Sequence, residues 1–200
     1  MGFDIYGLNP NNPNNAVKPK SLDWSEKHTD EEEKDYFDAI NTYEEEVVGH
    51  YFRNNVWFWR PLWSFVVQIS GDILTDKDIM NGGVNSGHKI CKTKANRIAA
   101  RLKKTIDSGS LDAVQKEADE SMAKIKKHND KVRDELDELN KTVKEKTGKE
   151  LAPVDYPEPY KTQWDKTYAK EDWNGHYPFS ADNIKEFYQF CKNSGGFEIW

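Results

Sequence analysis

The chain has 200 residues and a mass of 23.2 kDa, which suits one domain or one domain with an appendage. Aromatic residues make up 12% of it, which excludes a fully disordered chain. No stretch approaches the roughly 18 apolar residues of a membrane-spanning helix. The net charge of -6 conceals ten acids against two lysines in Ser25–Glu46, and seven bases without an acid in Lys89–Lys104. These blocks predict two solvated faces that face each other in the fold or, alternatively, a nucleic-acid mimic and a phosphate-binding face.

The first 50 residues predict a strand, a loop and an acidic helix. Phe3–Tyr6 alternates apolar and polar residues, as a half-buried strand does. Residues 11–29 are rich in Asn and Pro near their start and are expected to form a loop. Asp30–Val48 has apolar residues at three- and four-residue steps, which predicts an amphipathic acidic helix that ends at Gly49.

A dense aromatic block follows this helix. Tyr51–Phe65 contains seven aromatic residues in fifteen positions. Asn54–Trp59 is expected to be extended, because aromatic residues favour strands and a residue before proline is disfavoured in a helix. Pro61 fits the first turn of the helix that comes next. Asn81–His88 has the sequence NGGVNSGH, which is typical of a glycine-rich loop.

Two helices are predicted in the middle of the chain, over Thr93–Ile106 and Leu111–Lys146. The longer helix carries a heptad seam of apolar residues with one polar member, Asn129. We expect the two helices to form an antiparallel hairpin that projects from the aromatic core, with Asn129–Val143 as its exposed, partner-seeking end. Because an Asn in such a seam is best explained by fixing register or pairing state, a second copy of the chain is one candidate partner.

The C-terminal part predicts a short helix over Ser180–Asn193 and a final strand over Phe197–Trp200. Ser180 can cap the helix. The simplest partner for the final strand is Phe3–Tyr6, which would bring the two ends of the chain together. The residues expected on the inner face of the helix are Ile184, Phe187, Phe190 and Cys191.

The predicted fold is mainly α, with a small antiparallel β-sheet that joins the termini and a projecting long helical hairpin. Residues 1–92 and 151–200 are assigned to an aromatic-rich globular domain. Residues 93–150 are assigned to the helical hairpin, which is inserted into that domain.

The candidate site lies where the aromatic block meets the glycine-rich loop. Arg and Asn side chains on an aromatic platform can hold bases and phosphates, and each stacked base contributes about 1–3 kcal/mol. Alternatively, the rings form the core and Arg53 and Arg60 pair with the acids of Ser25–Glu46. The loop likewise either binds an anion or makes a tight turn. The candidate ligand- or partner-binding residues are Arg53, Asn54, Asn55, Trp59, Arg60, Asn85 and His88.

Catalytic and metal-binding patterns are weak in this sequence. The five histidines have no metal-binding spacing, and neither a nucleophile motif nor a phosphate-loop motif occurs. His88 and Cys91 would form a nucleophilic pair only if their side chains met. No catalytic residue, metal or cofactor is therefore predicted. Cys91 and Cys191 lie a hundred residues apart, which predicts free thiols in a reducing, cytoplasmic compartment and leaves a single disulfide as the alternative.

Three segments carry a resemblance to a known group of proteins: Met1–Pro10 (MGFDIYGLNP), Tyr51–Trp63 (YFRNNVWFWRPLW) and Ser194–Trp200 (SGGFEIW). In these segments the chain resembles small uncharacterised proteins encoded by bacteriophages and prophages, in which a Gly-His element like Gly87–His88 follows the aromatic block. The acidic insert, residues 11–48, and the long helix depart from the shorter relatives. The resemblance implies a non-structural phage protein in the cytoplasm of an infected host cell, and no mechanism.

The sequence thus favours a phage-encoded binding protein without catalysis. It would interfere with a host factor by protein–protein contact, as a host-defence inhibitor does. The alternative is a nucleotide- or nucleic-acid-binding protein that sequesters its ligand with the aromatic block and the glycine-rich loop. No membrane partner is expected.

Overall fold

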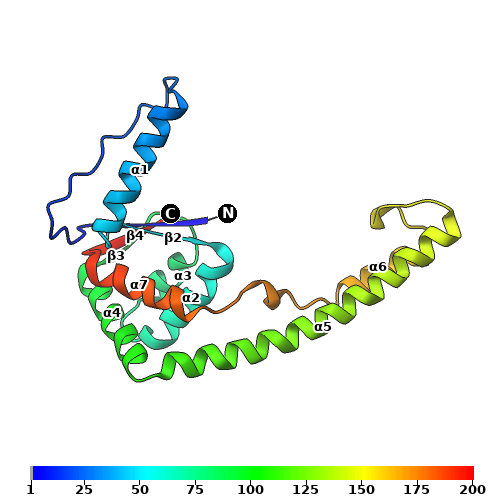
Figure 1. The fold of residues 1–200 in the computed structure, drawn as a ribbon. Helices are drawn as coiled ribbons and strands as arrows, with labels where there is room; N and C mark the ends of the chain where they lie inside the picture. Colours follow the sequence, from blue (N-terminus) through cyan, green and yellow to red (C-terminus); the bar gives the residue numbers. More distant parts are fainter. Residues whose placement is uncertain (1) are drawn as a thin grey trace. The chain divides into compact units, whose positions relative to one another are not determined.

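The computed structural model describes residues 2–200, so Met1 of the MGFDIYGLNP segment lies outside the described residues. The described residues form seven α-helices, two 3-10 helices and four strands (Figure 1). The predicted fold, mainly α with a small antiparallel sheet that includes both ends of the chain, is confirmed. None of the helices in residues 2–200 has the length and apolar character that a membrane crossing requires.

The chain divides into two compact units, which are described separately. One unit comprises the residues up to Ala113 together with Phe179–Trp200, and the other comprises Val114–Pro178. This division differs from the predicted one, because it places the helix after residue 92 in the first unit and residues 151–178 in the second.

The sheet of the first unit is antiparallel throughout and has the strand order β2-β1-β4-β3. Ile5 lies opposite Ile199, so the strands from the two ends of the chain pair at the centre of the sheet, as predicted. Ile90 lies opposite Phe197, on the same face as these isoleucines. The strands are β1 (Gly2–Gly7), β2 (Tyr51–Asn55), β3 (His88–Cys91) and β4 (Gly196–Ile199).

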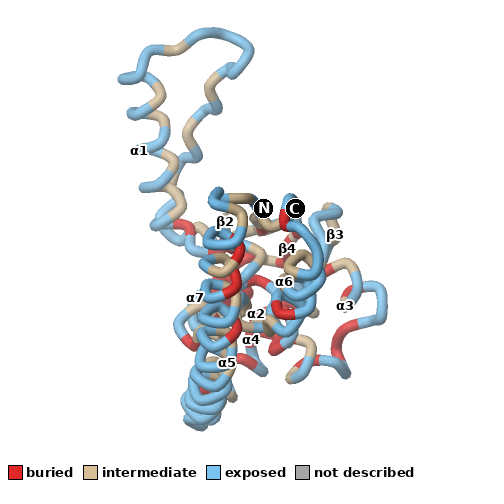
Figure 2. Tube along the Cα trace, turned by 90° about the vertical axis from the view of Figure 1, so that its right-hand side faces the viewer, coloured by how far each residue is buried: buried red, intermediate tan, exposed pale blue. Residues whose placement is uncertain are grey.

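Three helices cover one face of this sheet: α2 (Val56–Ser70), α4 (Lys92–Asp107) and α7 (Ala181–Asn193). They pack against the sheet and against one another, and the core lies between the sheet and these helices (Figures 1 and 2). Ser180 caps α7, because its hydroxyl accepts a hydrogen bond from the backbone of Asn183. The predicted inner face of α7 is buried as expected, and the largest fully buried side chains are Trp59, Phe187, Phe190, Phe197, Ile5, Leu62, Ile90, Ile98, Leu102, Leu111, Ile184 and Ile199.

The aromatic block departs from its prediction at one point. The side chain of Asn55 accepts hydrogen bonds from the backbone N–H groups of Trp57 and Phe58 and so caps the start of α2. The extended backbone therefore ends at Asn55, and the expectation of extended structure as far as Trp59 is wrong. Pro61 consequently lies inside α2, one turn beyond the predicted position.

The predicted glycine-rich loop over 81–88 is shorter in the structure. A helix, α3 (Asp76–Gly82), precedes it, and strand β3 begins at His88. Thr75 and Asp78 cap α3 reciprocally, each side chain bonding the backbone N–H of the other residue.

The acidic helix is α1 (Asp30–Glu46), as predicted. Thr29 and Glu32 form a capping box at its start. No residue of α1 is buried, and Figure 2 shows only exposed and intermediate residues along it. This helix is therefore held by local interactions and not by a place in the core.

Helix α5 (Ser110–Thr147) begins in the first unit and supplies most of the second. After α5, the chain reverses direction and runs back alongside it. The returning elements are η1 (Pro153–Asp155), α6 (Tyr160–Tyr168) and η2 (Trp173–His176). The Tyr156 hydroxyl donates to the Asn140 side chain over 2.8 Å, and Lys170 pairs with Glu135 at 2.6 Å.

The α5 seam is covered within this unit. Val132, Leu139 and Val143 are only 4%, 6% and 1% exposed, so the prediction of an exposed, partner-seeking end over Asn129–Val143 is wrong. A long helical hairpin is present, but the returning segment pairs with α5, whereas α4 packs on α7, α2 and β4. The apolar stripe of α4 is thus already buried in the first unit.

Candidate functional site

The structure places Trp59 at the centre of the core. Its side chain is 0% exposed, and its indole N–H donates to the Gly82 carbonyl over 2.8 Å. Its ring stacks on Phe3 and Trp63, with centroids 5.3 and 5.7 Å apart. A base cannot stack on a ring whose faces are already covered, so Trp59 is a core residue.

The two predicted asparagines also have structural roles. Asn54 is 8% exposed, and its side-chain amide donates to the Asn183 side chain over 2.7 Å. This bond joins β2 to the start of α7. Asn55 caps α2, as described above. Both side chains therefore make hydrogen bonds within the fold that a ligand would have to replace.

The remaining exposed candidates do not converge with Trp59. The Arg53 Nε lies 3.7 Å from the Asp4 carboxylate, directly across the β1–β2 pair, and not beside an acid of Ser25–Glu46. The predicted pairing with that acidic segment is therefore wrong for Arg53. Arg60 is exposed on α2, and the Asn85 side chain donates to the Gly2 carbonyl over 2.7 Å.

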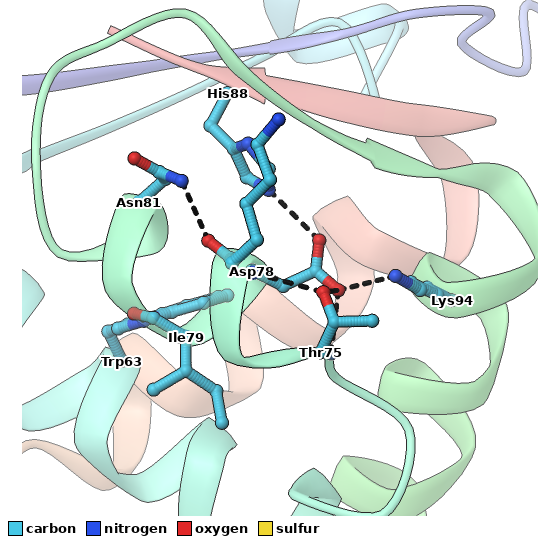
Figure 3. A network of polar contacts seen from close by, with 8 residues as sticks. Trp63, Thr75, Asp78, Ile79, Asn81, His88 and Lys94 are labelled. Atoms are coloured by element: carbon cyan, nitrogen blue, oxygen red, sulfur yellow. Dashed lines mark hydrogen bonds and ion pairs between the residues drawn. The ribbon is translucent and has the colours of Figure 1, made fainter.

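His88 belongs to a buried polar cluster centred on Asp78 (Figure 3). The His88 ring nitrogen Nε2 lies 2.9 Å from one oxygen of the Asp78 carboxylate. The other oxygen accepts hydrogen bonds from the Lys94 ammonium group and from both the backbone N–H and the hydroxyl of Thr75. The Asp78 side chain is only 5% exposed, whereas those of His88 and Lys94 are 12% and 26% exposed.

The partners of Asp78 determine its charge state. Burial by itself would raise the pKa of this carboxyl, but hydrogen bonds from Lys94, Thr75 and His88 outweigh burial and lower its pKa below the usual range. Asp78 is therefore an anion that joins α3 to β3 and α4. Of these residues, only His88 was predicted as a site residue from the sequence. The Thr75-x-x-Asp78 capping pattern was the available signal for Thr75 and Asp78.

The cluster does not form the nucleophilic pair that the sequence left open. His88 and Cys91 lie three residues apart on β3 and point to opposite faces of the sheet. No hydrogen bond joins them. Both cysteines are free thiols, and burial raises the pKa of Cys191. Within residues 2–200, no group of three or more His, Cys, Asp or Glu side chains is placed to hold a metal ion.

The acidic helix α1 is the second candidate for a functional site. Trp24, from the preceding loop, packs on Tyr36 and Phe37, with ring centroids 6.0 and 5.9 Å apart. Trp24 and Phe37 nevertheless remain 53% and 48% exposed. Among the described acids of Ser25–Glu46, only Asp38 has a basic ion-pair partner, Lys34 on the same helix. Helix α1 thus presents unneutralised carboxylates beside exposed aromatic rings.

The basic block of Lys89–Lys104 does not neutralise α1. Its ion pairs are with other acids of the first unit, and no ion pair within residues 2–200 joins the two blocks. These pairs are Lys89–Glu198, Lys94–Asp78, Arg101–Asp72 and Lys103–Asp107.

Comparisons of the chain with protein-family models, curated proteins and solved structures give no significant match, so they assign neither a family nor a function.

Proposed function

We propose that this is a non-catalytic binding protein that acts by protein–protein contact and presents α1 to its partner. The observation that carries this proposal is a capped helix of 17 residues without a buried residue in its own chain. Helices of this length owe most of their stability to packing of an apolar face. A partner that covers Trp24 and Phe37 would supply the packing that the chain itself does not provide.

The chemistry of α1 specifies the partner. Carboxylates without ion-pair partners attract a positively charged surface and speed the encounter with it. Exposed rings contribute most to affinity when they fill an apolar pocket from which water is excluded. We therefore expect a basic host protein with an apolar groove, inhibited because α1 occupies its surface. This agrees with the phage-like resemblance and with action in the cytoplasm of an infected cell.

The nucleotide- or nucleic-acid-binding alternative loses its platform. Trp59 is enclosed by other rings, and the Asn54 and Asn55 side chains bond within the fold. The net charge of -6 also opposes non-specific attraction to a nucleic-acid backbone.

The test is retention of a host protein by immobilised full-length chain. In one variant three exposed α1 carboxylates become amides: Glu31→Gln, Asp35→Asn and Glu45→Gln. These substitutions leave the capping box intact. A matched variant makes the same charge change on α5 with Glu117→Gln, Asp134→Asn and Glu145→Gln.

We expect a host protein that the wild type and the α5 variant retain and that the α1 variant loses at least tenfold. Trp24→Ala should weaken retention as well. The melting temperatures of all variants should stay within a few degrees of the wild type, because the altered side chains are exposed. Equal retention by the α1 and α5 variants, or no retained host protein, would contradict the proposal.

A further inference from the structure

A pocket of about 440 Å³ lies in the first unit, between the loop that follows β1, the start of α4 and the end of α7. No carboxylate lines it, although the chain has more acids than bases. The lining residues are Asn9, Pro10, Asn11, Asn12, Lys92, Asn96, Lys192, Asn193 and Gly195. Its wall therefore consists of ammonium, amide and backbone groups.

Backbone hydrogen bonds fix the walls of this pocket. The N–H groups of Asn9 and Asn11 donate to the carbonyls of Ser194 and Asn193 over 3.0 and 2.7 Å, so the loop closes the C-terminal end of α7. Gly195 has a φ of +66°, and a Cβ there would lie 2.1 Å from the Asn9 carbonyl oxygen. The close approach of these two segments thus requires glycine.

The two lysines of the pocket have no counter-charge. Lys92 and Lys192 form neither an ion pair nor a side-chain hydrogen bond within residues 2–200, whereas Lys89 and Lys94 of the same basic block are paired. The side-chain amides of Asn9 and Asn96 likewise make no hydrogen bond in this part of the chain. Lys92 is also the first residue of α4, and Cys91 gives that helix start no side-chain cap.

We propose that this pocket binds a small phosphorylated sugar. Two ammonium groups without counter-ions suit a phosphate dianion, because charge-assisted hydrogen bonds to phosphate are the strongest that lysine makes. Amide side chains both donate and accept, as sugar hydroxyl groups require. No aromatic ring lines the pocket, so a nucleobase would find no stacking surface. The volume lies within the range of about 300–1,000 Å³ for small-molecule sites.

This site is independent of the proposed contact through α1. None of its residues belongs to α1, so either proposal can fail without the other. It also gives a role to Lys92, which is one of the members of the basic block without an ion-pair partner within residues 2–200.

The test is calorimetric titration of the full chain with ribose 5-phosphate, in parallel with ribose and with inorganic phosphate. We expect saturable binding of ribose 5-phosphate, binding of phosphate at least tenfold weaker, and no heat from ribose. Lys92→Gln and Lys192→Gln should each weaken binding about tenfold or more. Asn96→Asp should do the same, because it places a carboxylate in the pocket. The matched control is Lys104→Gln, on the same helix but outside the pocket, which should bind like the wild type.

Three results would overturn the proposal. The first is absence of binding by the wild type. The second is equal binding of phosphate and ribose 5-phosphate, which would show an unspecific anion site. The third is an equal loss of affinity in Lys104→Gln and Lys92→Gln, which would show that binding depends on the net charge of the protein and not on the pocket. The melting temperatures of the variants should match the wild type, since the substituted side chains are on the surface.

Discussion

The side chain of Asn129 and the backbone of Asp172 exchange two hydrogen bonds. The Asn129 amide donates to the Asp172 carbonyl and accepts from its N–H group, and both bonds are 2.9 Å long. This reciprocal pattern is the one that two residues make in a hydrogen-bonded pair of an antiparallel sheet. Asn129 therefore sets the register of the returning segment on α5. From the heptad pattern alone, Asn129 was expected to set the register between two paired helices.

Substitution of Asn129 by leucine should destabilise the second unit. Asn129→Leu leaves the N–H and carbonyl groups of Asp172 without their partners in a partly buried position, which costs about 1–3 kcal/mol. Urea denaturation measures this loss, and sedimentation should show an unchanged oligomeric state. Lys131→Leu, an equally apolar change on the exposed side of α5, should cost much less. A more stable protein or a new oligomer would restore the helix-pairing interpretation.

Two neighbouring tryptophans of α2 should respond differently to truncation. Trp59→Ala removes a fully buried ring and its hydrogen bond to Gly82, which should lower the free energy of unfolding by roughly 3–5 kcal/mol. Trp57 is 43% exposed, and Trp57→Ala should cost about 1 kcal/mol or less. Denaturant titrations of the two variants compare the same change two residues apart. Similar losses would mean that the block is not organised around Trp59.

Helices with a one-sided apolar stripe were predictable from sequence, because the helical spacing of the apolar residues determines which face of the helix is buried. Helices α4 and α7 and the buried face of each follow from residues such as Ile98 and Phe187. The pairing of β1 with β4 was also accessible, since two short alternating segments at the ends of the chain needed partners. These features depend on the spacing of apolar residues along a segment and on the need to bury them.

Features that depend on one side chain meeting a residue far away in the sequence were not predictable. Asn129 bonds a residue 43 positions away, and Asp78 collects His88 and Lys94 from two other elements. Aromatic residues and asparagines in the block around Trp59 serve equally well as a core or as a ligand platform. Only the fold, which encloses Trp59 with other rings, separates these two roles.

The Asp78 cluster predicts a specific dependence of stability on pH. Because the folded-state pKa of Asp78 is lowered, its contribution is fully present above the unfolded-state pKa of about 4 and is lost as pH falls through the folded-state pKa. Asp78→Asn should cost roughly 3–5 kcal/mol at pH 7, as expected when one partner of a buried ion pair is removed. The difference in unfolding free energy between wild type and variant should shrink between about pH 5 and pH 2.

Asp76→Asn provides the control for this measurement. Asp76 is exposed in the first turn of α3, two residues before Asp78. Its loss should cost less than about 1 kcal/mol, as for an exposed charge at a helix start, and should leave the pH profile of stability nearly unchanged. Parallel pH profiles of Asp78→Asn and wild type would show that the carboxylate of Asp78 is not stabilised by its partners.

Two glycines with similar backbone conformations should differ sharply when replaced by alanine. Gly195 and Gly109 have φ values of +66° and +73°, so alanine costs roughly 1–2 kcal/mol at either position from backbone strain alone. At Gly109 the new Cβ meets nothing within 4 Å, but at Gly195 it would lie 2.1 Å from the Asn9 carbonyl oxygen. Gly195→Ala must therefore push the Asn9 loop away from the end of α7. We expect it to lower the melting temperature by several degrees more than Gly109→Ala does, and to speed exchange of the Asn9 and Asn11 amide protons. Equal melting temperatures would show that this loop yields without cost.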